Sequence, residues 1–409
     1  MKITNVEIIP IYPRLAARSA VYNAHFSNWN LRTIYKVHAD NGLVGYGDIR
    51  SGPLAESAVK PLIGRSPFEY MMNDLSPGLG SALYDLMGKY LDLPAHQLMG
   101  QKVRDYVAVA AWTKPASPDT LKIEVPRAVE EGYTIMKMHT CSHYDILMQN
   151  RAVEEVAPEG FKMHYDFNGN RSVATSQSLI RELENSRVVG FIEDPIARND
   201  IEGWRTLREN TSLPIIMHVP QLGGVQEIIL GASDVYMLGG LIGHTLKAGF
   251  AYGAANIPVL MQITGGTLTK ALAMHLSAVL PTATMHSVNI DDQYEDDVTV
   301  ERIPVVNGAS PVPEGPGLGV EVNEDALAEL AAREPTPVPK HVAVLHLADG
   351  HDIFYPSLED VNVEKMTGRE EGAIRGLELE LWDDDGSDEF IKIYERVQKN
   401  GPHVSESRT

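Results

Sequence analysis

The spacing of hydrophobic and polar residues changes near Arg104. Beyond it, short apolar runs alternate with segments whose apolar residues recur at helical spacing. These runs cover residues 106–112, 134–139, 161–167, 188–195, 213–219, 234–238, 257–263 and 283–290. Eight strands about 25 residues apart, each followed by a helix, predict an α/β fold with a modified (β/α) TIM-like barrel over 105–319. A doubly wound open sheet is the alternative, but no glycine fingerprint opens its first crossover.

The first 104 residues follow a different pattern. Strand-like runs occur over residues 3–12, 31–40 and 41–49. The pair Asn41-Gly42 favours a tight hairpin turn between the last two. The pattern then becomes helical up to Met99. We expect an α+β capping domain over 1–104, completed by residues 320–336.

A third pattern begins after the proline-rich linker "EPTPVPK", which marks a boundary near residue 337. A hairpin turn is predicted at Asp349-Gly350. The segment "GLELELWDDDGSDEFIKIYERV" alternates around a second, acidic turn, which indicates two more strands. We expect a small β-rich extension over 337–409, with a disordered end over 400–409.

Composition limits the partners and the compartment. A formal net charge of -20 opposes the counterion release that drives binding to phosphate backbones, so we expect no nucleic-acid partner. No apolar run approaches the roughly 20 residues of a membrane span, and the N-terminus lacks the apolar core of a signal peptide. The single cysteine, Cys141, fits a reducing compartment. These features predict a cytoplasmic protein without a membrane partner.

Polar residues stand at or just beyond the ends of several apolar runs. They are Lys137, His139, His164, Asp166, Asn168, Glu193, His218 and Gln262. The carboxyl ends of barrel strands meet at one face, so Asp166 and Glu193 would repel each other unless a cation lay between them. Oxygen ligands of this kind suit Mg²⁺. Each acid also has a structural interpretation, since Asp166 could start a turn and Glu193 could cap a helix.

The arrangement resembles the enolase superfamily, in particular its mandelate racemase and sugar-acid dehydratase branch. The resemblance covers residues 1 to about 333 and rests on "HYDFNGN", "FIEDP" and the closing "PEGPGLGVEVNE". It implies Mg²⁺ held by three strand-end acids, of which Asp166 and Glu193 match the first two. It also implies a base that removes the proton next to a substrate carboxylate, and it makes a homo-oligomer the expected assembly.

The sequence departs from this family where the third metal ligand is expected. The fifth strand, "PIIMHVP", offers no acid, and spacing places Val219 at the ligand position. His218 stands one residue earlier and would reach the site only if the strand bulged. An imidazole ligand would favour a transition metal over Mg²⁺. An ordinary barrel histidine is the other interpretation of His218.

The bases also differ from the family pattern. The second strand carries Lys137 and His139, so His139 is the candidate base and Lys137 could hold a substrate carboxylate. The seventh strand supplies Gln262 where relatives have a histidine, and the sixth supplies Leu238 or Gly239 where they have its acid partner. Chemistry with two bases is therefore disfavoured, whereas elimination of water with one base remains open.

Other side chains are candidates for the substrate or for solvent. His25 and Trp29 lie on the loop that covers the barrel mouth in relatives, and Asn168 and Gln262 are further candidate contacts. The acidic stretch 289–297 could place Asp291 or Asp292 at the barrel mouth, but we interpret it as a solvated loop. We expect a divalent-metal-dependent lyase that removes water from a sugar acid, a small-molecule carboxylate. The alternative is an altered relative that binds a ligand or assembles without the reaction.

Overall fold

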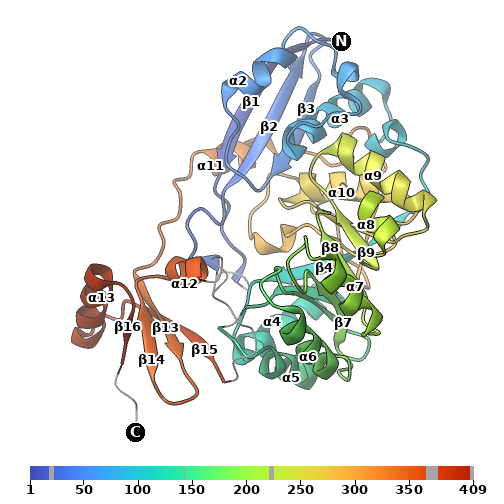
Figure 1. The fold of residues 1–409 in the computed structure, drawn as a ribbon. Coiled ribbons are helices and arrows are strands. Elements are labelled where there is room, and N and C mark those ends of the chain that lie inside the picture. The colour runs from blue at the N-terminus through green and yellow to red at the C-terminus, as the bar shows by residue number, and fades with distance from the viewer. Residues whose placement is uncertain (18–22, 142, 221–224, 365–375, 406–409) are drawn as a thin grey trace.

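A closed barrel forms the centre of the computed structural model, which describes residues 1–17, 23–141, 143–220, 225–364 and 376–405 (Figure 1). Each strand pairs in parallel with the next, and β11 pairs with β4 to close the ring. The strands are β4 (Tyr106–Thr113), β5 (Ile135–His139), β6 (Lys162–Asp166), β7 (Val189–Glu193), β8 (Ile215–His218), β9 (Val235–Leu238), β10 (Val259–Gln262) and β11 (Ser287–Val288). The barrel predicted from the eight apolar runs is confirmed.

Helices follow the barrel strands, as the amphipathic segments predict. They are α4 (Pro118–Glu130), α5 (Ile146–Val156), α6 (Val173–Leu183), α7 (Ile201–Glu209), α8 (Val225–Leu230), α9 (Ile242–Ala254) and α10 (Thr267–Val279). Ser117, Asp145, Ser172 and Asp200 cap four of them by accepting backbone N–H bonds. A short strand, β12 (Ala309–Pro311), pairs antiparallel with β4, and the 3₁₀ turn η4 (Asp291–Gln293) follows β11.

The N-terminal sheet has the order β1 (Ile3–Ile11), β2 (Arg32–Ala39), β3 (Val44–Ile49), all antiparallel. Gly42 has φ +84° in the turn between β2 and β3, as the Asn-Gly pair predicts. The helices α2 (Glu56–Val59), α3 (Pro77–Leu91) and α11 (Glu324–Ala331) accompany the sheet, together with the 3₁₀ turns η1 (Lys60–Leu62), η2 (Pro67–Tyr70) and η3 (Ala95–Leu98). A Cβ on Gly45 would lie 2.1 Å from the Ala82 carbonyl oxygen, so glycine lets α3 pack closely on β3.

A buried ion cluster joins this sheet to the barrel. Arg32 Nη2 lies 2.6 Å from Asp48 Oδ2 and 2.8 Å from Asp297 Oδ1. Asp297 also accepts the backbone N–H of Thr267 at the start of α10. Asp291, in the same stretch, is buried against Lys270. The interpretation of residues 289–297 as a solvated loop is therefore wrong, because these acids neutralise buried cations.

The C-terminal extension is a separate four-stranded antiparallel sheet of order β15-β13-β14-β16. Its elements are β13 (His341–His346), β14 (Asp352–Tyr355), α12 (Leu358–Glu364), β15 (Glu378–Asp383), α13 (Asp388–Asn400) and β16 (His403–Val404). The hairpin predicted at Asp349-Gly350 is confirmed. In Figure 1 this sheet lies beside the barrel, with β15 next to α4 and α5.

Two expectations for the extension are wrong. The segment after the acidic turn is the helix α13, not a strand, because its apolar residues Phe390, Ile393, Tyr394 and Val397 recur at helical spacing and pack on β13. Ser387 caps this helix. Residues 403–404 form β16 where a disordered end was expected, and 406–409 lie outside the described residues.

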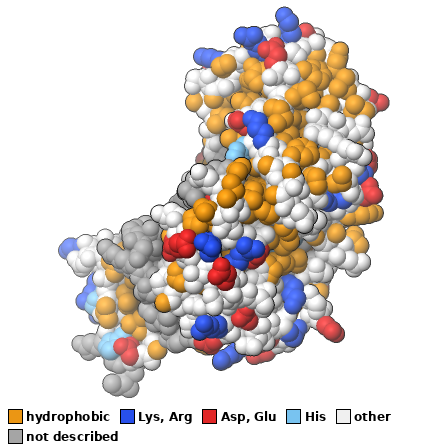
Figure 2. Space-filling model, turned by 45° about the vertical axis from the view of Figure 1, so that its right-hand side comes forward, with side chains coloured by type: hydrophobic (Ala, Val, Ile, Leu, Met, Phe, Trp, Pro, Cys, Tyr) orange, Lys and Arg blue, Asp and Glu red, His pale blue; other side chains and the backbone are white. Residues whose placement is uncertain are grey.

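The surface carries hydrophobic side chains over much of the body formed by the N-terminal sheet and the barrel (Figure 2). Exposed large ones include Met72, Ile229 and Phe250. Among the described residues, none of the helices combines the length and apolar character that crossing a membrane requires.

Candidate active site

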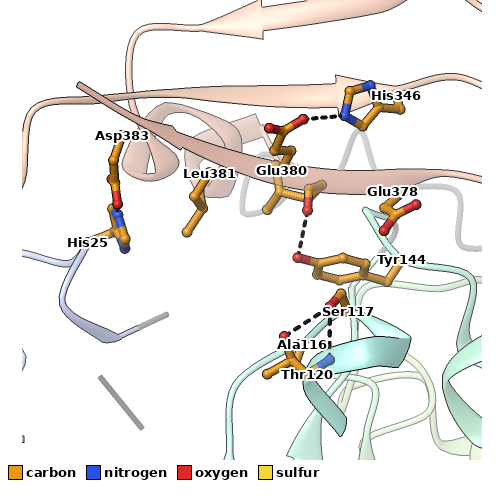
Figure 3. Close-up of a pocket in the computed structure, with 11 residues that line it drawn as sticks. His25, Ala116, Ser117, Thr120, Tyr144, His346, Glu378, Glu380, Leu381 and Asp383 are labelled. Carbon is orange, nitrogen blue, oxygen red and sulfur yellow. Dashed lines mark hydrogen bonds and ion pairs between the residues drawn. The ribbon is translucent and has the colours of Figure 1, made fainter. Parts of the chain in front are cut away.

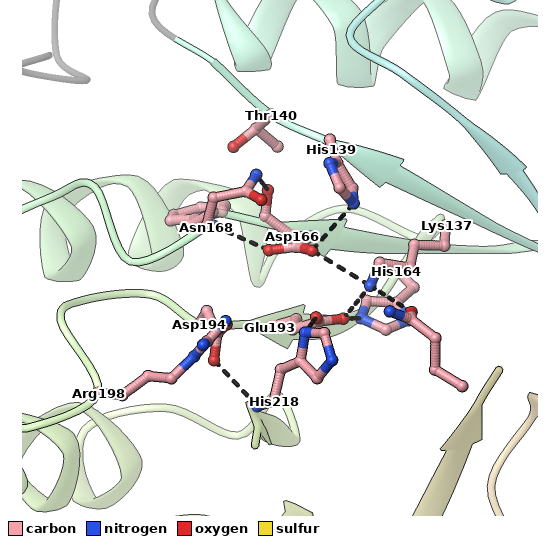
Figure 4. Close-up of polar contacts among 12 residues, drawn as sticks. Lys137, His139, Thr140, His164, Asp166, Asn168, Glu193, Asp194, Arg198 and His218 are labelled. Atoms are coloured by element: carbon pink, nitrogen blue, oxygen red, sulfur yellow. Dashed lines mark hydrogen bonds and ion pairs between the residues drawn. The ribbon is translucent and has the colours of Figure 1, made fainter. Parts of the chain in front are cut away.

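A buried cluster of charged side chains lies inside the barrel at the carboxyl ends of β5, β6 and β7 (Figure 4). Lys137 Nζ lies 2.6 Å from Glu193 Oε2 and 3.1 Å from Asp166 Oδ2. It also donates to Gln262 Oε1 at 2.9 Å. The cation predicted between the two acids is thus the ammonium group of a lysine of the same chain.

The protonation of the cluster follows from these contacts. Burial alone would raise the pKa of Asp166, but the charges of Lys137 and His139 outweigh it and hold this pKa well below its usual value. Burial and the neighbouring charge of Asp166 raise the pKa of Glu193 to about 8. The two acids raise the pKa of Lys137 despite its burial. Lys137 therefore stays charged, and the Asp166 carboxylate is the ionised partner.

Two histidines on neighbouring strands complete the inner side of the cluster. His164 Nε2 lies 2.7 Å from Glu193 Oε2, and His164 Nδ1 lies 2.8 Å from His286 Nε2. Burial and the charge of Lys137 lower the pKa of His164 well below its usual value, and burial has the same effect on His286. Both rings are neutral near pH 7. The sequence analysis missed His286, although a histidine in the apolar run 283–290 was a signal of the same kind as His164.

His139 occupies the open side of the cluster. Its side chain is 31% exposed, whereas those of Lys137, Asp166 and Glu193 are at most 4% exposed. His139 Nε2 lies 3.3 Å from Asp166 Oδ2. The edge of its ring meets Trp112 with centroids 5.1 Å apart. His139 is therefore partly open to solvent, and so is His218, whose side chain is 29% exposed, on the other side of Glu193.

His218 faces the barrel interior without a bulge in its strand. Its Nδ1 lies 3.4 Å from Glu193 Oε1. Glu193 pairs with Ile216 in a regular register, and two residues on from Ile216 the same face presents His218. Val219 follows the strand at φ +53° and is 52% exposed. The expectation that His218 needs a bulge is wrong, because the inward positions of β8 are one residue earlier than the spacing suggested.

Asp194 is a third acid that the sequence analysis did not single out. It accepts the backbone N–H of His218 at 3.0 Å and pairs with Arg198. Burial raises the pKa of Asp194 to about 7. Ligand atoms of Glu193, Asp194 and His218 all lie within 4.8 Å of one another. The adjacent acids of "FIEDP" were the available signal.

This group fits a divalent ion by its donor chemistry. Two carboxylates and one imidazole are ordinary ligands, and Glu193 Oε1 is buried with no hydrogen-bond partner within the described chain. The imidazole shifts the preference from Mg²⁺ toward a transition metal. An ion between Asp166 and Glu193 would have to replace the ammonium of Lys137.

The strands on the far side of the barrel offer no second base. Gln262, at the end of β10, contacts Lys137. A Cβ on Gly239 would lie 1.8 Å from the Gln262 carbonyl oxygen, so no other side chain fits at that position. A cavity of about 270 Å³ lies between His218, Gln262 and one side of α9, from His244 to Tyr252.

The remaining candidate contacts take different positions. Asn168, at φ +54°, donates its backbone N–H to Asp166 Oδ1 at 2.8 Å and so orients this carboxylate. Trp29 stacks on Trp112 with centroids 5.5 Å apart, and thus joins the wall beside His139. His25 instead faces the extension, where its Nε2 lies 2.7 Å from Asp383 Oδ1 (Figure 3).

The extension also holds the loop that follows His139. Cys141 and Tyr144 belong to a hydrophobic cluster with Leu345, Leu358 and other residues of the extension, and Phe26 packs against it. The Tyr144 hydroxyl donates to the Leu379 carbonyl oxygen at 2.9 Å (Figure 3). The extension therefore contacts both the loop after β5 and the segment that carries Trp29.

Known proteins resemble this chain over most of its length. D-galactonate dehydratase of Verminephrobacter eiseniae is 26% identical over 359 residues, which are 75% of this chain and 93% of that protein. D-galactonate dehydratase of Pectobacterium atrosepticum is 25% identical over 354 residues, 73% of this chain and 91% of that protein.

Solved structures share the fold. A mandelate racemase/muconate lactonizing family protein from Azoarcus superposes with a TM-score of 0.66 at 23% identity, over 81% of this chain and 98% of that one. The dipeptide epimerase from Cytophaga hutchinsonii, solved with Mg and a dipeptide, gives a TM-score of 0.67 at 20% identity, over 81% and 98%. Residues 120–326, which include the whole charged cluster, match the family model described as enolase C-terminal domain-like. The chain belongs to the enolase superfamily.

Proposed function

We propose that the protein is a lyase that removes water from a sugar acid. The observation that carries the proposal is the position of His139, partly exposed at the barrel mouth and 3.3 Å from the buried Asp166 carboxylate. Relatives named D-galactonate dehydratase support this class of substrate. The reaction begins when a base removes the proton on the carbon next to the substrate carboxylate.

His139 is the proposed base. Its imidazole accepts the proton from carbon, and the ionised Asp166 stabilises the positive charge that the ring gains. The bond between the next carbon and its hydroxyl oxygen then breaks, and a carbon–carbon double bond forms. The departing oxygen takes the proton back from the imidazolium, so one molecule of water leaves and His139 returns to its neutral form.

Lys137 acts as a positioning residue in this scheme. It is buried and charged, and its contacts are to Asp166, Glu193 and Gln262. A lysine with a raised pKa cannot serve as a base near neutral pH. Its ammonium keeps Asp166 ionised, and Asp166 in turn orients His139.

A divalent ion is the second part of the proposal. Glu193, Asp194 and His218 would hold it, and Asp166 would join them if Lys137 withdrew. When bound, the ion would supply Lewis-acid stabilisation of the negative charge that develops on the substrate carboxylate. Mg²⁺ is the ion that the resemblance implies, and a transition metal is the ion that the imidazole favours.

Substrate contacts are proposed for Trp29, Gln262 and Asn168. Trp29 lines the wall beside His139, and Gln262 lies at the cavity next to His218. His25 is proposed to act indirectly, through its ion pair with Asp383 of the extension. Homo-oligomerisation and a cytoplasmic location stay predictions, and the exposed hydrophobic side chains of α8 and α9 are candidate interface residues.

A second candidate function is favoured by the Lys137 bridge. Because an internal ammonium already neutralises Asp166 and Glu193, the barrel can be stable with no metal ion. The protein would then bind a sugar acid without converting it.

The test is turnover of a panel of sugar acids, with and without added Mg²⁺ or Mn²⁺. We expect one acid to lose water, and His139→Ala to abolish the activity while leaving the melting temperature unchanged. His351→Ala, at a partly exposed histidine of the extension, is the matched control. Wild-type activity in His139→Ala would overturn the assignment of the base, and no turnover of any acid would favour the second candidate.

A further inference from the structure

Arg50 carries a guanidinium for which the described residues supply no carboxylate. The residue follows β3, is half-buried, and donates its backbone N–H to the Thr264 carbonyl oxygen at 2.9 Å. Thr264 lies two residues beyond Gln262, at the carboxyl end of β10. The Nε atom of Arg50 is buried and has no hydrogen-bond partner within the described part of the chain. Arg50 is thus fixed at the barrel mouth with an unmatched charge.

Arg32, a nearby arginine, differs from Arg50 because its guanidinium is paired with carboxylates. Arg32, on β2, is fully buried and pairs with both Asp48 and Asp297. Burial alone would lower the pKa of Arg32, but these two acids outweigh it and raise the pKa. Burial lowers the pKa of Arg50, and only Tyr294 opposes the effect. A half-buried cation without a counterion is costly, so its presence favours an anionic ligand.

The surroundings of Arg50 connect it to the reacting centre. Its guanidinium carbon lies 3.8 Å from the centroid of the Trp29 ring. Trp29 stacks on Trp112, and Trp112 meets the ring of His139. One aromatic wall therefore leads from Arg50 to the proposed base. The two rings between them separate Arg50 from the proton that His139 would remove.

We propose that Arg50, held over the Trp29 ring, binds a second carboxylate of the substrate, at the end opposite the reacting carbon. The inference rests on the proposed function for the choice of a sugar acid, and it narrows the substrate to a sugar diacid. A guanidinium presents paired N–H donors that match the two oxygens of a carboxylate. Contact with the Trp29 ring restricts the guanidinium before the ligand arrives.

The experiment is calorimetric titration with three ligands in the His139→Ala background, where turnover is prevented. The ligands are a six-carbon sugar diacid, the matching acid with one carboxylate, and that acid phosphorylated at its far end. We expect the diacid to bind about ten- to hundredfold more tightly than the mono-acid, and Arg50→Met to remove the difference. Arg50→Lys keeps the positive charge but loses the paired N–H donors of the guanidinium. Its preference for the diacid should therefore fall between that of the His139→Ala background and that of Arg50→Met.

Arg205→Met is the matched control, since Arg205 lies on α7 and, among the described residues, pairs only with the exposed Glu202. Its preference should equal that of the unchanged background. Equal binding of diacid and mono-acid, or an unchanged preference in Arg50→Met, overturns the inference. Tighter binding of the phosphorylated acid than of the diacid overturns the choice of a carboxylate.

The outcome can be separated from that of the proposed function. An Arg50-dependent preference for the diacid, together with no turnover of any acid by the wild type, upholds the binding site and rejects the lyase. Turnover of a mono-acid that Arg50→Met leaves unchanged upholds the lyase and rejects the binding site. Melting temperatures of all variants show whether each is folded.

Discussion

Lys137 Nζ lies 2.6 Å from Glu193 Oε2 and bridges this acid to Asp166, so the barrel contains its own cation between two strand-end carboxylates. The bridge supplies the compensation that two neighbouring buried acids require. It also competes with any metal ion for the same oxygen atoms.

Lys137→Met should lower the free energy of unfolding by about 3–5 kcal/mol, because it leaves two buried acids without their cation. Mn²⁺ or Mg²⁺ should restore part of the loss, since the vacated oxygens can then bind an ion. Denaturant unfolding with and without each ion measures both effects.

The matched control for this variant is Lys122→Met. Lys122 also lies 2.6 Å from an acid, Glu155, but both side chains are exposed to solvent. Its removal should change stability far less and give no response to metal. If Lys137→Met were as stable as the wild type, Lys137 would not be the main counterion of the pair.

Arg32→Met should destabilise the junction between the N-terminal sheet and the barrel by about 3–5 kcal/mol, since Asp48 and Asp297 would stay buried without a partner. The measurement is chemical denaturation followed by tryptophan fluorescence. Arg14→Met, which removes an exposed guanidinium and leaves Asp296 paired with Arg333, should have a much smaller effect. If both variants lost a similar free energy of unfolding, burial would not explain the contribution of the Arg32 ion pairs to stability.

The free energy of unfolding should decrease at low pH, in part because His275 is buried in its neutral form. Its Nε2 lies 3.1 Å from the Leu318 carbonyl oxygen, and burial lowers its pKa from 6.5 to about 3. Between these two pH values the unfolded chain binds a proton that the folded chain excludes. The free energy of unfolding therefore decreases as pH falls through this window, by up to about 1.4 kcal/mol per pH unit for this group.

His275→Gln should reduce the steepness of this decline, measured by urea unfolding at several pH values. Part of the decline in the free energy of unfolding should remain in this variant. The buried His164 and His286 cause it, because their pKa values are also lowered. His351→Gln, at a partly exposed position, should leave the slope as it is in the wild type. An unchanged slope in His275→Gln would show that this ring is not neutral in the folded protein.

Tyr144→Phe should loosen the contact between the extension and the loop after β5, because the Leu379 carbonyl oxygen loses its donor. The expected cost is about 1 kcal/mol. Hydrogen exchange should become faster in β15 and in the loop after His139. Tyr90→Phe, at an exposed ring of α3, provides the comparison, and equal exchange in both variants would argue against the contact.

Much of the fold could be predicted from the sequence, because alternating apolar runs and turn pairs such as Asn41-Gly42 are local signals. The eight barrel strands and both hairpins follow from them. The error at α13 arose because short segments with mixed spacing suit both a strand and a helix. Only packing of Phe390 and Val397 on β13 decides between these possibilities.

The site was harder to predict, because its partners lie on different strands. Asp166 and Glu193 are close together as expected, but nothing local shows that Lys137 reaches between them. The inward direction of His218 depends on the register of β8. An error of one residue in the predicted register places the side chain on the opposite face of the strand. Arg50 could not be singled out from the sequence. It stands out only because the described residues around it supply no carboxylate, and the absence of a partner produces no sequence motif.

The close approach of Gly239 to the Gln262 carbonyl oxygen limits how this barrel could change its chemistry. A second proton carrier would need a histidine at the end of β10 and an acid beside it on β9. Substitution at residue 239 alone would force the two strands apart. Any evolutionary or engineered route from this protein to a two-base epimerase must therefore first reshape the backbone on that side.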